Sequence, residues 1–152
     1  MTTSSARNIQ SRSLVQTGAL VVGAVFLLVG VLGFIPGITS DYSTMGLAGH
    51  ASMAMLLGVF QVSVLHNIVH LLFGVVGVLM ARSVPGARNY LIGGGIIYLV
   101  LWIYGLFTGN MDSAANFVPL NTADNWLHLL LGIGMIALGI LLTRNRSTAR
   151  GR

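Results

Sequence analysis

The stretch LVQTGALVVGAVFLLVGVLGFI, residues 14–35, decides the fold class of this protein. It contains no charged side chain and only two clearly polar ones, Gln16 and Thr17. An α-helix rises 1.5 Å per residue, so about 20 apolar residues cross the roughly 30 Å hydrocarbon core of a bilayer. Residues 14–35 are therefore predicted to form a membrane-spanning helix.

Three further apolar runs follow, at about residues 64–81, 90–107 and 124–143. Of the 152 residues, 55% are hydrophobic and 7% are charged, whereas about 25% of the residues of a soluble domain are charged. So few charges leave an apolar surface that must face lipid. The sequence predicts an all-α integral membrane four-helix bundle, with the lipid bilayer as its main partner.

Outside these runs lie two short tails, residues 1–13 and 144–152, the short connections 82–89 and 108–123, and one longer loop, residues 36–63. The loop begins polar and becomes apolar over residues 53–60, a stretch that is too short to span a membrane. We expect residues 53–60 to form an interfacial or half-inserted helix, packed against the outer ends of the spans.

Arginine and aspartate are completely separated along the chain. The arginines lie in the two tails and between the second and third runs: Arg7, Arg12, Arg82, Arg88, Arg144, Arg146, Arg150 and Arg152. The acidic residues lie at the opposite ends of the runs: Asp41 in the long loop, Asp112 in the loop between the third and fourth runs, and Asp124 at the turn into the fourth run. Because arginine near the ends of spans stays in the cytoplasm, we predict a bacterial inner-membrane protein with both termini cytoplasmic. The net charge of +5 forms no continuous basic stripe, so no nucleic-acid partner is expected.

The second and fourth runs share an eight-residue pattern, N-x-x-H-L-L-x-G. It begins at Asn67 in the second run and at Asn125 in the fourth. Two rare polar residue types and a glycine thus recur at equal spacing near the same end of both runs. We interpret the pattern as an internal repeat, in which two helical hairpins are related by a pseudo-two-fold axis along the membrane normal.

Helical spacing places the repeated residues on one face of each span, because residues three and four apart are neighbours on a helix. The first stripe holds Asn67, His70, Gly74 and Gly77, and the second holds Asn125, His128, Gly132, Met135 and Gly139. Since glycine lets helices approach closely in lipid, the four glycines are predicted to serve helix packing.

The histidine and asparagine side chains of these stripes need partners, because polar groups inside a span are costly. The candidate polar cluster contains His66, Asn67, His70, Asp124, Asn125, Trp126 and His128. We favour a structural role, in which Asn67 and Asn125 bond to His70 and His128 or to loop carbonyls. We also expect the two histidines to face each other inside the bundle.

Three ligand-binding alternatives use the same residues. His66 and His70 have the i, i+4 spacing of metal ligands, and His128, His50 or Asp124 could complete a site for a divalent metal. Opposed His70 and His128 could instead hold haem b. The third alternative is a pocket for a small molecule, a quinone or a proton, as in redox or transport proteins.

Other kinds of chemistry find little support in the sequence. There is no cysteine, which excludes disulfides and thiolate sites. Gly93, Gly94 and Gly95 lie inside a span without a preceding strand or a lysine, so they are not a phosphate-binding loop. Ser63 is expected to cap the second span, and Asp124 suits the start of the fourth. The sequence favours a non-enzymatic structural or accessory protein. Besides lipid, the partners that such a role implies are a second copy of the chain, in a homo-oligomer, or another component of a membrane complex.

Two sequence blocks carry a resemblance to a known family. The first is F-x-V-x-x-L-H-N-x-V-H, from Phe60 to His70, and the second is D-N-x-L-H, from Asp124 to His128. Over about residues 14–143 the chain resembles a bacterial family, common in actinobacteria, of small four-span membrane proteins that is classified as a domain of unknown function. The family often has Asn and Pro where Ser63 and Val64 stand here. The resemblance implies the four-span architecture and implies no activity.

Overall fold

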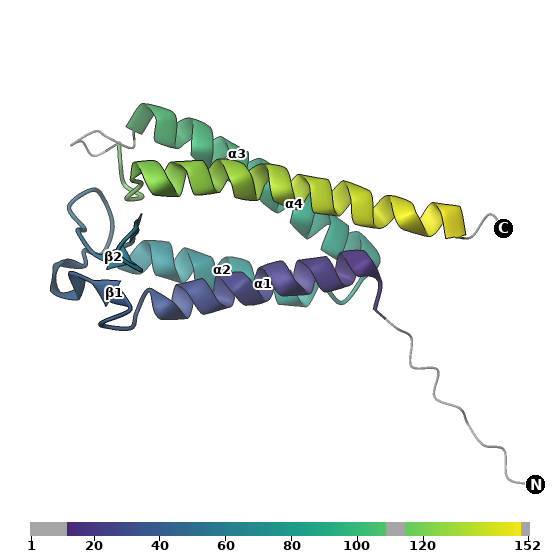
Figure 1. Ribbon diagram of the computed structural model, residues 1–152, viewed down its shortest axis with the longest axis horizontal. Helices are drawn as coiled ribbons and strands as arrows, with labels where there is room; N and C mark the ends of the chain where they lie inside the picture. Colours follow the sequence, from purple (N-terminus) through teal and green to yellow (C-terminus); the bar gives the residue numbers. More distant parts are fainter. Residues whose placement is uncertain (1–11, 109–114, 150–152) are drawn as a thin grey trace, which may run out of the picture.

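The computed structural model of the protein describes residues 12–108 and 115–149 (Figure 1). Its helices are α1 (Leu14–Leu32), α2 (Val64–Met80), α3 (Val84–Thr108) and α4 (Thr122–Ala149). Three two-residue strands and one short 3₁₀ helix lie between α1 and α2: β1 (Thr39–Ser40), η1 (Tyr42–Thr44), β2 (Met55–Leu56) and β3 (Phe60–Gln61). The predicted all-helical architecture is therefore confirmed, with the addition of this small sheet.

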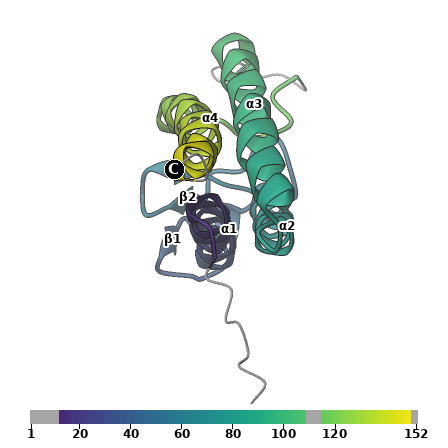
Figure 2. The ribbon, with the colours of Figure 1, turned by 90° about the vertical axis from the view of Figure 1, so that its right-hand side faces the viewer.

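The four helices lie along one long direction and associate as two hairpins. Helix α1 packs mainly against α2, and α3 mainly against α4, while the contacts between the two pairs are sparser. Figure 1 shows α1 with α2 and α3 with α4, and Figure 2 gives the view along the bundle. The connections 33–63 and 115–121 lie at one end of the molecule, called the sheet end here. The turn 81–83 lies at the other, called the turn end.

Each hairpin is closed by a pair of glycines whose backbones nearly touch. A Cβ atom at Gly74 would lie 2.7 Å from the carbonyl oxygen of Gly23, and a Cβ at Gly95 would lie 2.7 Å from that of Gly132. No real side chain tolerates such distances. The other glycines of the predicted stripes also lie against side chains: Gly77 against Tyr90 and Gly139 against Ile92.

Three helices are long and apolar enough to cross a membrane: α1, α3 and the part of α4 up to Thr143. Helix α2 is apolar but has 17 residues. Helix α3 begins at Val84, earlier than the predicted residue 90, because Ser83 accepts a hydrogen bond from the Gly86 backbone N–H (3.1 Å) and Pro85 is compatible with a first helical turn.

The expected interfacial helix over residues 53–60 is wrong, because this segment forms β2, a tight turn and β3. Leu57 and Gly58 have φ values of 55° and 70°, and the Val59 N–H donates to the Leu56 carbonyl (3.1 Å). Two consecutive positive φ values match the turn that joins antiparallel strands and are incompatible with a helix. Ala54 and Leu56 of this segment, with the neighbouring Val62, form a small core that packs against Val29 and Leu32 of α1.

Hydrogen bonds attach this sheet to both hairpins. The Thr39 hydroxyl donates to the carbonyl of Leu32 (3.1 Å) at the end of α1, and the Asn121 amide donates to the Val59 carbonyl (2.7 Å). The sheet is thus a cap across the sheet end. Of the charged residues that predict the topology, Arg7, Asp112, Arg150 and Arg152 lie outside the described residues.

Candidate functional site

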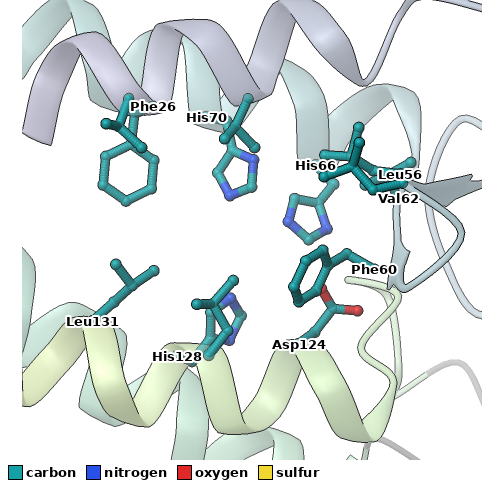
Figure 3. Close-up of a pocket in the computed structure, with 13 residues that line it drawn as sticks. Phe26, Leu56, Phe60, Val62, His66, His70, Asp124, His128 and Leu131 are labelled. Carbon is teal, nitrogen blue, oxygen red and sulfur yellow. The ribbon is translucent and has the colours of Figure 1, made fainter. Parts of the chain in front are cut away.

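Three histidines and one aspartate meet between α2 and α4 near the sheet end. His66 and His70 are one turn apart on α2, and Asp124 and His128 are one turn apart on α4. Figure 3 shows His70 opposite His128 and His66 opposite Asp124, all directed into the space between the helices. His66, Asp124 and His128 are buried and His70 is partly buried, so the structure places the imidazoles inside the bundle.

These residues line a cavity of about 280 Å³ that is bounded by α1, α2, α4 and the sheet (Figure 3). The rest of its lining is apolar: Val25, Phe26 and Val29 of α1; Leu56, Leu57, Phe60 and Val62 of the sheet segment; and Leu127 and Leu131 of α4. Known ligand cavities of about 300 Å³ and above have this composition, apolar walls with a few polar groups.

A second, smaller cavity of about 120 Å³ lies on the other side of the same histidines. It shares His66, His70 and His128 with the larger cavity. Its remaining lining comes from α2, α3 and the segment that follows α3: Ser63, Leu65, Val69, Tyr98, Leu101, Phe117 and Val118. The imidazoles thus form a wall with a hollow on each face.

Two aromatic rings contact the histidines from the side of the turn end. Phe26 of α1 lies 5.5 Å from His70, and Tyr98 of α3 lies 5.2 Å from His128, measured between ring centroids. Phe26 and Tyr98 stack on each other at 5.4 Å. His66 meets His70 edge to face at 4.5 Å. Each hairpin therefore supplies one aromatic ring that supports its own histidine.

One ring nitrogen of each histidine has no partner in the described structure, although His66 also donates a hydrogen bond to the backbone carbonyl of Pro119. The Nδ1 atoms of His66, His70 and His128 are buried and have no hydrogen-bond partner. A neutral imidazole carries one donor and one acceptor nitrogen. Each ring therefore has a buried polar atom available to a bound molecule.

Asp124, by contrast, is paired. Its carboxylate accepts hydrogen bonds from the backbone N–H groups of Gln61 (2.9 Å) and Asn121 (3.2 Å), while the Asp124 N–H donates to the Asn121 side-chain oxygen (2.9 Å). This reciprocal arrangement caps α4 and fastens β3 to it. The predicted position of Asp124 at a helix start is confirmed, and Ser63 caps α2 as predicted by accepting from the His66 N–H (3.1 Å).

The expected hydrogen bonds from asparagine to histidine are not formed. Asn67 packs on Gly33 at the end of α1, where an added Cβ would overlap its amide, and Asn125 packs on Gly105 of α3 in the same way. The side-chain oxygens of both asparagines have no partner. Each asparagine faces the other helix of its own hairpin, where a glycine leaves room for it, and so points away from the neighbouring histidine.

Trp126 does not join the cluster. Its side chain is 56% exposed and lines neither cavity. His50 also lies outside both linings. The repeat and the helical spacing predicted the histidines, but not the rings that support them. Phe60 and Val62, which line the larger cavity, appeared in the sequence only as parts of the family block.

The metal alternative gains no support from the geometry, since no group of three or more His, Cys, Asp or Glu side chains placed to hold a metal occurs within residues 12–108 and 115–149. For haem b, the stacked Phe26 and Tyr98 rings already occupy the space beside His70 and His128 into which a porphyrin would extend. The larger cavity suits a smaller molecule.

Comparisons with known proteins place the chain in a family without supplying an activity. Neither the curated proteins nor the solved structures contain a match to it. Residues 16–141 match a family described as a domain of unknown function, DUF4383, and this match covers most of the chain. The protein belongs to the DUF4383 family.

Proposed function

We propose that the protein is a four-span membrane protein that binds a small molecule in the cavity lined by His66, His70 and His128. The observation that carries this proposal is the pairing of a cavity of about 280 Å³ with three buried imidazoles whose Nδ1 atoms lack partners. Buried polar groups are almost always hydrogen-bonded, and unpaired ones point to a missing partner or to a function.

The proposed membrane topology has four spans and both termini on the cytoplasmic side. Helix α2 has 17 residues and is about 26 Å long, the lower limit for crossing a bilayer. Arg12, Arg82 and Arg88 lie at the turn end, whereas Asp41 and Asp124 lie at the sheet end. This separation supports a cytoplasmic turn end in the inner membrane.

We also propose that the two hairpins are related by a pseudo-two-fold axis along the bundle. In support, Phe26 and Tyr98 each follow a crossing glycine, Gly23 or Gly95, by three residues, and they stack on each other. His70 and His128 each precede the partner glycine by four residues. The two cavities then occupy equivalent seams, one between α1 and α4 and the other between α2 and α3.

The second candidate is the structural or accessory role that the sequence favours. The observation in its favour is the close packing around glycine, with Asn67 seated on Gly33 and Asn125 seated on Gly105. In that role the bundle would hold a partner or a second copy in the membrane, and the histidines would serve only as aromatic packing groups.

One experiment separates the two roles. The wild-type protein, His128→Leu and Trp126→Leu are excised from membranes in polymer-bounded discs, and the retained small molecules are identified by mass spectrometry. Binding at the histidines predicts one molecule that is enriched with the wild type and with Trp126→Leu and lost from His128→Leu. Equal retention by all three variants, or no enriched molecule with the wild type, would favour the structural role.

A further inference from the structure

The larger cavity opens on the apolar side of the bundle. Its lining includes three exposed side chains: Val25 of α1 (49%), Leu57 after β2 (62%) and Leu127 of α4 (37%). These residues place the mouth at the seam between α1 and α4, two helices whose outer surfaces are apolar and long enough to face lipid. A molecule that enters here comes from the bilayer.

The sheet closes the other approach. Leu56, Phe60 and Val62 cover the cavity from the sheet end. Hydrogen bonds from Gln61 to Asp124 and from Asn121 to Val59 hold this cover onto α4. Access from water at the sheet end would require these bonds to break, whereas access through the α1–α4 seam requires movement of apolar side chains only.

The polar groups of the lining lie on the inner wall, and the mouth is apolar. His70 and His128 can donate to or accept from a bound oxygen atom, and His66, which donates to the Pro119 carbonyl, can accept through its Nδ1. The lining contains no arginine, and the chain has no lysine, so an anionic phosphate head group would find no cation to pair with. A cavity of about 280 Å³ has room for one ring or a short head group.

We propose, building on the ligand site above, that the cavity receives from the bilayer a lipid-soluble molecule with a neutral, oxygen-bearing head group on a single apolar chain. The head group lies against His66, His70 and His128, and the chain leaves between Val25 and Leu127 into the lipid. Quinones and long-chain alcohols share this chemistry. The smaller cavity at the α2–α3 seam, about 120 Å³, is less than half as large and is not the main site.

The test uses the full chain in phosphatidylcholine nanodiscs, with unfolding followed by circular dichroism. The probes are a decyl-substituted benzoquinone, dodecanol, benzoquinone without a tail, and decylbenzene without oxygen. A ligand at 100 times its Kd raises the melting temperature of a chain of this size by about 5 to 10 °C. We expect such a shift with one of the two tailed, oxygen-bearing probes and none with decylbenzene; which of the two acts identifies the head group.

Variants at the cavity mouth test whether the probe enters through the α1–α4 seam. Val25→Trp fills the mouth and is expected to weaken binding of the tailed probe at least tenfold, as is Leu127→Trp from the other side of the seam. Val21→Trp, on the same exposed face of α1 but outside both linings, is the matched control and should bind as the wild type does. A circular dichroism spectrum that matches the spectrum of the wild type establishes that each variant is folded.

Three results overturn the inference while leaving the ligand site in place. The first is that benzoquinone without a tail binds as tightly as the tailed form and that Val25→Trp does not change its binding. The second is that no probe stabilises the wild type although the discs retain a histidine-dependent molecule of another class. The third is an equal loss of binding in Val21→Trp, since the seam would then have no special role. If the discs retain no histidine-dependent molecule, the ligand site itself fails.

Discussion

The α1–α2 hairpin and the α3–α4 hairpin have the same kinds of contact between their two helices, and they differ at the sheet end. In each, a glycine pair brings the backbones together, Gly23 with Gly74 and Gly95 with Gly132. In each, an asparagine is seated on a glycine of the partner helix, and an aromatic ring supports a histidine. Helix association in lipid depends on such close packing, because apolar burial gives no drive there.

The difference lies in how each hairpin begins its second helix. The first reaches α2 through a folded segment with three short strands, and Ser63 supplies the cap. The second reaches α4 through a shorter connection, and Asn121 with Asp124 supplies the cap. One turn before the shared histidine, the first hairpin therefore carries His66 and the second carries Asp124. Helix packing constrains the middle of the bundle, while the sheet end is where chemistry can vary.

The comparison requires both hairpins to have the same direction in the membrane, which gives the largest expected effect. The chain has no cysteine, so single cysteines can be introduced at Leu47, Phe117 and Ser83, all exposed. A membrane-impermeant maleimide added outside intact cells should label Leu47→Cys and Phe117→Cys fully and Ser83→Cys only after lysis. Labelling of Leu47→Cys and Phe117→Cys from opposite sides of the membrane would show that the two hairpins do not have the same direction.

The glycine crossings predict the next largest effect. Gly74→Ala and Gly132→Ala each place a Cβ within about 3 Å of backbone or side-chain atoms of the partner helix. Each should lower the free energy of unfolding by about 1 to 3 kcal/mol in detergent, as overpacking does. A large loss in one hairpin only would show that the two crossings are not equivalent.

Matched controls for the crossings lie in the second hairpin, on the same helices as Gly95 and Gly132. An added Cβ at Gly93 or Gly134 meets no atom within 4 Å. Gly93→Ala and Gly134→Ala should leave stability unchanged or raise it by up to about 1 kcal/mol, since alanine favours the helix. Losses at these positions equal to those at the crossings would mean that glycine acts through the backbone and not through helix contact.

The two caps should differ in strength. Asp124→Ala removes two hydrogen bonds to backbone N–H groups and releases β3 from α4, so we expect a loss of about 2 kcal/mol. Ser63→Ala removes one bond and should cost about 1 kcal/mol. Asp124→Asn and Ser63→Thr keep an acceptor oxygen and should recover most of the stability. Equal losses in the two alanine variants would show that the sheet is not held by Asp124.

Most of the helical framework is predictable from sequence, because apolar runs of spanning length and equal motif spacing are local signals. The sheet is not, since its strands are two residues long and its turn depends on positive φ at Leu57 and Gly58. The spacing predicts that His70 and His128 share an inward stripe. The spacing does not predict that Asn67 packs on Gly33, 34 positions away in the chain, because that contact depends on tertiary packing.

The smallest expected effect on stability is also the most informative about the histidines. If His70 and His128 were bonded to the asparagines, replacing either by leucine would cost about 1 to 3 kcal/mol by leaving a buried group unpaired. In the structure no such bond exists, and the imidazole Nδ1 atoms lack partners.

His70→Leu and His128→Leu should therefore change the free energy of unfolding of the ligand-free protein by less than about 1 kcal/mol, with a gain possible, because each removes an unsatisfied buried polar group. Both variants should at the same time lose the stabilisation that a bound molecule gives to the wild type. Thermal unfolding in detergent, with and without the tailed quinone or alcohol, measures both quantities. A loss above about 1 kcal/mol without ligand would return these residues to the structural role, and equal behaviour of the two variants would support equivalent places for them in the two hairpins.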